Sequence, residues 1–210
     1  MTADAAAGKQ TLGPWWVVAS AAAAAVGIAV GRPLAELVRE PLSQIAGGLP
    51  TVAFFGAFLG LCLGLAHTLA RRQLVPAVEW TLASTLGGAV GFVLGVTLAA
   101  RITDPLRGQV IVYVSEVLGY LVFGAVAGVF LGLAQWTTWR TRGRRTAGGV
   151  AGWTVLSALG WALGFTVTAG VGLELTRFPS VTVRDVIFGG FAGLIAGGTQ
   201  ALVATWRRGR

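Results

Sequence analysis

Very few side chains in this sequence could take part in chemistry. The only histidine is His67, the only cysteine is Cys62, and Glu116 lies further inside a long apolar stretch than any other acidic residue. Paired carboxylates, a Ser-His-Asp set or a multi-histidine metal site would each need more partners than these. The sequence also lacks the Gly-x-x-x-x-Gly-Lys run that binds phosphate. We therefore expect no enzyme activity, no metal and no cofactor.

Six polar residues recur at matched positions and form the main candidate site. Three are serines that each follow a tryptophan by four residues, and three are His or Gln residues that each follow a stripe of glycines. They are Ser20, Ser84, Ser157, His67, Gln135 and Gln200. We expect them at one depth near the cytoplasmic ends of their helices, where each His or Gln can hydrogen-bond a serine on a neighbouring helix. They are interpreted first as interhelical fastening and alternatively as a ring that binds a solute.

Glu116 is a second candidate. Counting back eight residues from Gly124 places it near the outer membrane surface, which favours an interfacial carboxylate. A buried carboxylate coupled to transport is the alternative. Cys62 is interpreted as a small packing residue, because a lone cysteine cannot form an intrachain disulfide.

The composition points to a lipid bilayer. The 210 residues have a mean hydropathy of +0.75, and 11% of them are charged, whereas soluble domains carry about a quarter. The net charge of +8 comes from arginines at the ends of apolar stretches. That placement is typical of membrane orientation and not of a nucleic-acid-binding face. The expected partners are the bilayer and other membrane subunits, with no nucleic acid.

Six stretches are long enough to cross a bilayer, which takes about 20 residues. They are Pro14–Val30, Thr51–Ala70, Pro76–Ala100, Gln109–Trp139, Gly148–Leu173 and Arg184–Trp206. The intervening segment Pro33–Ala46 is predicted to be a short interfacial helix interrupted by Pro41.

Charge sets the predicted orientation. Ten of the 16 Lys and Arg residues lie in one set of connecting segments and six in the alternate set. The positive-inside rule then places both termini in the cytoplasm, with residues 1–13 as a flexible N-terminal segment. The membrane is expected to be the bacterial inner membrane. Seven tryptophans near the cytoplasmic side are interpreted as an aromatic belt: Trp15, Trp16, Trp80, Trp136, Trp139, Trp153 and Trp206.

Two patterns alternate three times along the chain. In the first, Trp, Ser and Gly follow one another at spacings of four and seven, beginning at Trp16, Trp80 and Trp153. In the second, three glycines are spaced four residues apart, as at Gly56, Gly60 and Gly64; Gly124, Gly128 and Gly132; and Gly189, Gly193 and Gly197. Each glycine triplet lies on one helical face, where small residues let helices approach closely.

This repetition predicts the fold. We expect one all-α integral membrane domain over residues 1–210, with six transmembrane helices in three tandem two-helix repeats at 14–72, 76–145 and 148–210. Two-helix units share one orientation, so the copies should be related by a pseudo-threefold axis along the membrane normal.

The segment Gly132–Trp136, Gly-Leu-Ala-Gln-Trp, resembles segments of uncharacterised bacterial multi-pass membrane proteins. That resemblance implies a membrane location and no activity. Mitochondrial carriers also have three two-helix units, but their Pro-x-acid-x-x-base signature does not occur here. We expect a non-enzymatic membrane protein, an accessory or subunit acting through helix and lipid contacts. The alternatives are a small-solute or ion transporter or channel using the polar ring, and an intramembrane enzyme using His67 or Glu116.

Overall fold

The computed structural model is all-helical and describes residues 13–70, 77–106, 112–140, 147–175 and 180–206. Its helices are α1 (Pro14–Ala46), α2 (Leu49–Ala70), α3 (Ala77–Thr103), α4 (Val112–Arg140), α5 (Ala147–Leu175) and α6 (Val181–Trp206), with a 3-10 turn, η2 (Asp104–Leu106), after α3. These six helices are long and apolar enough to cross a membrane. The chain is therefore a membrane protein of six long helices, as its sequence predicts.

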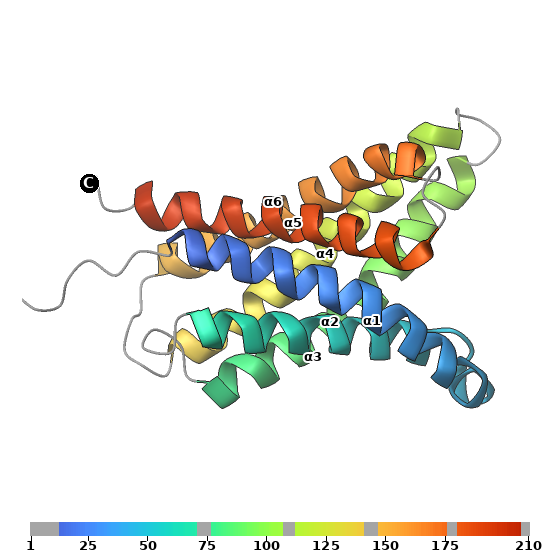
Figure 1. Cartoon of the computed structure of the whole chain (residues 1–210), viewed down its shortest axis with the longest axis horizontal. Coiled ribbons are helices and arrows are strands. Elements are labelled where there is room, and N and C mark those ends of the chain that lie inside the picture. Colours follow the sequence, from blue (N-terminus) through green and yellow to red (C-terminus); the bar gives the residue numbers. More distant parts are fainter. Residues whose placement is uncertain (1–12, 71–76, 107–111, 141–146, 176–179, 207–210) are drawn as a thin grey trace, which may run out of the picture.

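The helices close into a ring. Each of them packs along the next one in the chain, and α6 packs along α1. Figure 1 shows α1 in blue beside α6 in red, with successive helices running in opposite directions. Residues from the beginning of one helix and the end of the next therefore meet at the same end of the ring.

The first helix is longer than predicted. α1 continues unbroken for 33 residues through both Pro33 and Pro41, so the expected separate interfacial helix is wrong. A proline inside a helix costs about 3 kcal/mol. Ala35, just after the first proline, is buried, so this part of the extension packs against the bundle. α1 ends where Gly47 adopts a φ of 65°, a conformation that favours glycine, and α2 begins two residues later.

Burial separates an outer face from an inner face on the helices. Large apolar side chains are exposed on the outside of the ring, for example Leu69, Leu121, Leu159 and Leu202. The interior holds small and aromatic residues together with the buried Leu59, Leu63 and Leu131. An outer surface of leucine and valine is costly in water and stable in lipid, which agrees with a bilayer as the surrounding solvent.

Most of the sequence features used to predict the orientation lie outside the described residues. These are the N-terminal segment apart from Gly13, and the arginines at 71–72, 142–145 and 207–210.

Candidate functional site

The six candidate polar residues are buried at one end of the ring. Ser84 and Ser157 have no exposed surface, and the most exposed of the six, Gln200, is 4% exposed. They come from all six helices, three near helix beginnings and three near helix ends. Buried polar groups need hydrogen-bond partners, so the structure has to supply these inside the bundle.

Each serine pairs with the His or Gln of the following helix. Ser20 Oγ lies 2.8 Å from His67 Nε2, which links α1 to α2. Gln135 Nε2 donates to Ser84 Oγ at 3.0 Å and links α3 to α4. Gln200 Nε2 donates to Ser157 Oγ at 3.0 Å and links α5 to α6. These are the pairings that the sequence spacing allows.

Tryptophans supply a second set of bonds. Trp153 Nε1 donates to Gln135 Oε1 at 3.3 Å, which joins α5 to α4. Trp16 Nε1 donates to Gln200 Oε1 at 3.0 Å, which joins α1 to α6. Both glutamines therefore use the amide nitrogen toward one neighbouring helix and the amide oxygen toward the other.

His67 makes different contacts. Ser20 Oγ also donates to the Trp16 carbonyl at 2.8 Å, so in a neutral ring His67 Nε2 carries the proton and donates to the serine. His67 Nδ1 is then an acceptor, and it has no hydrogen-bond partner among the residues that the structure describes. The ring stacks on Trp16 with centroids 3.8 Å apart and meets Trp80 edge-on at 6.4 Å.

Three tryptophans fill the centre of this end. The ring centroids of Trp16, Trp80 and Trp153 lie 5.9–6.2 Å apart pairwise, and all three side chains are buried. The interpretation of these three as a lipid-facing belt is wrong, although Trp15 is 70% exposed. The spacing of Trp and Ser four residues apart, on one helical face, was the signal that the tryptophans share the serines' inward direction. The polar ring therefore encloses packed aromatic rings.

The glycine triplets lie where neighbouring helices approach most closely. A Cβ on the middle glycine of each triplet would overlap the backbone oxygen of a serine on the next helix: Gly60 with Ser84, Gly128 with Ser157, and Gly193 with Ser20. Five of the other six glycines also face the backbone of the neighbouring helix; at Gly64 and Gly132, for example, the added atom would lie 2.7 and 3.0 Å from a Cα. At Gly197 it would lie 2.6 Å from the Ser20 side chain. Any side chain there would push the helices apart.

A cavity of about 610 Å³ lies toward the other end of the ring and is partly open. At about 1.5 Å per residue, the twelve residues from Ser20 to Arg32 put its mouth about 18 Å from the polar ring along α1. All six helices contribute to its wall. Its lining residues are Ile28, Arg32, Ala35, Glu36, Thr51, Val52, Phe55, Phe92, Val96, Glu116, Tyr120, Phe123, Phe165, Ala169, Arg184, Asp185 and Phe188.

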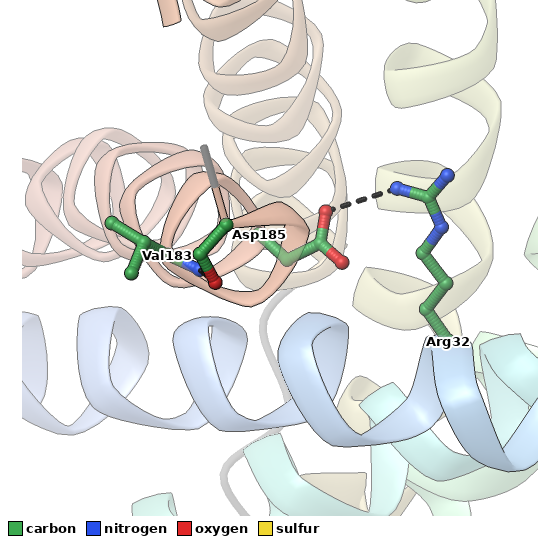
Figure 2. Close-up of polar contacts among 4 residues, drawn as sticks. Arg32, Val183 and Asp185 are labelled. Carbon is green, nitrogen blue, oxygen red and sulfur yellow. Dashed lines mark hydrogen bonds and ion pairs between the residues drawn. The ribbon is translucent and has the colours of Figure 1, made fainter. Parts of the chain in front are cut away.

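The cavity has an aromatic floor and a charged mouth. Five phenylalanines line it, and Phe92, Phe123 and Phe165 pack against one another with centroids 4.8–6.3 Å apart. At the mouth, Arg32 Nη1 lies 3.1 Å from Asp185 Oδ1. Figure 2 shows these two side chains reaching toward each other from α1 and α6.

Glu116 lies at the same mouth. Its side chain is exposed and lines the cavity. Cys62 is half-buried and packs against the hydrophobic core. Within the described ranges no three His, Cys, Asp or Glu residues are grouped so that they could share a metal ion.

The cavity was not among the predicted sites, but the repeat contains a signal for it. Phe55, Phe123 and Phe188 each precede the first glycine of a triplet by one residue, and Ile28, Phe92 and Phe165 each follow a repeat tryptophan by twelve. All six line the cavity. Comparison of the chain with protein-family models, curated proteins and solved structures found no match.

Proposed function

We propose that this chain is a non-enzymatic membrane protein whose polar ring is a structural seal, so that it acts through lipid or subunit contacts and does not conduct solutes. One observation carries this proposal: the ring residues bond to one another around three buried tryptophans. A conducting ring would instead have to present its polar atoms to water. Hydrogen bonds between helices stabilise membrane bundles by about 0.6–2 kcal/mol each, which suits a fastening role.

The proposal includes a triplicated architecture about a pseudo-threefold axis along the membrane normal. Its support is that contacts recur at equivalent positions. Serine meets His or Gln within each repeat, indole meets glutamine between repeats, and each glycine triplet meets the first helix of the next repeat. On this view the glycine triplets are the interfaces that hold the repeats together, as small residues four apart do in lipid.

We further propose that both termini lie in the cytoplasm and that the membrane is the bacterial inner membrane, on the basis of the arginine distribution. Cysteine labelling in intact cells tests the orientation. In a Cys62→Ala background, Arg71→Cys and Arg144→Cys should both resist an impermeant maleimide until the cells are opened, and Glu40→Cys should react at once. If one of positions 71 and 144 were labelled in intact cells and the other were not, the two would lie on opposite sides of the membrane, which contradicts the two-helix repeat.

Flux measurements test the seal. Liposomes that contain the purified chain should retain potassium and a small fluorescent anion as well as protein-free liposomes do. Replacing Trp80 and Trp153 together by alanine removes two of the three central rings and should increase leakage. Saturable flux through the unchanged protein would overturn the proposed role.

A small-solute transporter is the second candidate, and the cavity favours it. A partly open chamber at one end and a sealed ring at the other is the arrangement expected of a carrier that opens to one side at a time. Transport through the ring should be lost when Gln135 and Gln200 are both replaced by leucine. Flux that is unchanged in this double variant would exclude the ring as its path.

A further inference from the structure

The cavity has the features of a ligand site. Small-molecule pockets hold about 300–1,000 Å³, have mainly apolar and aromatic walls, and contain a few converging polar groups. This cavity falls inside that range, with five phenylalanines and a charged mouth. It lies apart from the polar ring, so an inference about it does not depend on the proposed function.

Two charged residues at the mouth remain after the ion pairs are assigned. Arg32 pairs with Asp185, and Glu36 pairs with Arg39, whose nitrogen lies 3.2 Å away. Of the charged lining residues, this leaves Arg184 and Glu116, which form no ion pair within the described part of the chain. One is a cation on α6 and the other an acid on α4, on opposite sides of α5 in the ring.

Buried polar atoms in the lining also lack partners. Arg184 Nε and Thr51 Oγ1 are both buried, and neither has a hydrogen-bond partner among the described residues. A buried donor without a partner destabilises the fold. A ligand with an anionic group at this point would supply the missing acceptor.

The charged residues of the mouth do not recur at equivalent positions of the three repeats, although the apolar lining residues do. Four residues before the first glycine of each triplet stand Val52, Tyr120 and Asp185, and all three line the cavity. The position of Arg184, five residues before its triplet, holds Thr51 and Gly119 in the other copies. Packing a threefold bundle does not require these charges, so their presence at one mouth indicates recognition of a charged group.

We propose that this cavity binds a zwitterionic molecule with an apolar body: the body lies on the phenylalanine floor, its anionic group is bound by Arg184, and its ammonium group by Glu116. The anionic group can accept charge-assisted hydrogen bonds from Arg184, and the ammonium group is attracted by the charge of the Glu116 carboxylate and by the ring face of Tyr120. The same chemistry occurs in a single-chain phospholipid from the bilayer and in a water-soluble apolar amino acid. Both are therefore tested as sources.

The test uses the full chain in uncharged dodecyl maltoside micelles. Saturable binding of dodecylphosphocholine is compared with that of dodecyltrimethylammonium and dodecyl sulfate, which share its alkyl chain but carry one charge each; free phenylalanine represents the water-soluble source. We expect one zwitterion to bind at least about tenfold more tightly than either singly charged probe, which corresponds to one charge-assisted contact. Preference for dodecylphosphocholine identifies a lipid source, and preference for phenylalanine a soluble one.

Matched variants locate the site. Arg184→Gln and Glu116→Gln should each weaken zwitterion binding about tenfold, whereas Arg101→Gln and Glu40→Gln change exposed residues outside the cavity and should leave it unaltered. Glu116 is exposed, so its replacement tests the proposal even if Arg184→Gln fails to fold. Three results would each overturn the proposal. The first is equal binding of all head groups, and the second is no saturable binding of any probe. The third is an equal effect of Glu116→Gln and Glu40→Gln.

Discussion

At the scale of single residues, the two glutamines carry the most connections in the ring. Gln135 bonds to Ser84 on α3 and receives the indole of Trp153 on α5. Gln200 bonds to Ser157 on α5 and receives the indole of Trp16 on α1. An amide suits this position because it offers a donor and an acceptor on one planar group.

Replacing Gln135 by leucine should destabilise the bundle. Leucine has a similar volume but removes both bonds, so we expect the free energy of unfolding to fall by about 1–3 kcal/mol. Unfolding in mixed detergent micelles measures the change. Gln44→Leu is the matched control, since Gln44 is exposed on α1 and should contribute little. Equal stability of the two variants would contradict a fastening role.

Replacing His67 by glutamine should be tolerated. Glutamine occupies the matching place in the other two helices, where it bonds a serine and accepts from an indole. A glutamine at position 67 can donate to Ser20 and lies toward Trp80, so we expect a change within about 1 kcal/mol. Leucine at the same position loses the bond to Ser20 and should be less stable than glutamine in the same unfolding assay. If glutamine destabilises the bundle as much as leucine does, position 67 is not equivalent to 135 and 200.

Residue types predicted the ring but not its centre. The spacing of Ser20 and His67 on their helical faces was enough to predict that they meet, because neighbouring helices were expected to pack along those faces. Trp16 was harder to place, since an indole near a helix end is equally suited to the membrane interface and to a buried cluster. Only its periodicity with Ser20 distinguishes the two environments.

At the scale of helices, the glycine triplets set how closely two helices pack. Gly193 on α6 lies against the Ser20 backbone of α1, whereas nothing lies within 4 Å of a Cβ placed on Gly198 of the same helix. Alanine at position 198 therefore changes helix propensity alone, whereas alanine at position 193 also changes the contact with α1.

Gly193→Ala should destabilise the bundle by about 1–3 kcal/mol, because the methyl group displaces α1. Gly198→Ala should be neutral or stabilising by up to about 1 kcal/mol, because alanine favours helix over glycine. Unfolding in mixed micelles compares the two variants directly. A destabilising Gly198→Ala together with a neutral Gly193→Ala would contradict close packing of α6 on α1.

Helix existence was easier to predict than helix length. A stretch of about bilayer length that lies in lipid has to be helical, because its backbone groups must form their hydrogen bonds within the segment. The end of α1 was missed because Pro33 and Pro41 usually stop helices in isolation. Tertiary packing after Pro33, seen in the buried Ala35, is a contact that local sequence does not encode. The cavity was missed for a similar reason, as its wall combines residues from all six helices.

At the scale of the whole molecule, α1 and α6 close the ring as other neighbours do. The Trp16–Gln200 bond joins them at the polar-ring end, and the Arg32–Asp185 pair joins them at the cavity mouth. The same end of the ring therefore holds the start of α1 and the end of α6. If the bundle consists of three equivalent repeats, the chain could begin at any of them without changing the contacts between helices.

A circular permutant tests that consequence. Joining the natural ends and opening the chain within residues 71–76 gives the helix order α3 to α6 followed by α1 and α2, with every repeat intact and every helix in its original direction. We expect this permutant to insert and to unfold within about 2 kcal/mol of the natural chain, because the contacts are unchanged and loop-closure costs vary slowly with length. Opening within residues 107–111 splits the second repeat and begins the chain on the opposite side of the membrane, so it should insert less efficiently. If the first permutant fails while the second succeeds, the two-helix repeat is not the folding unit of this bundle.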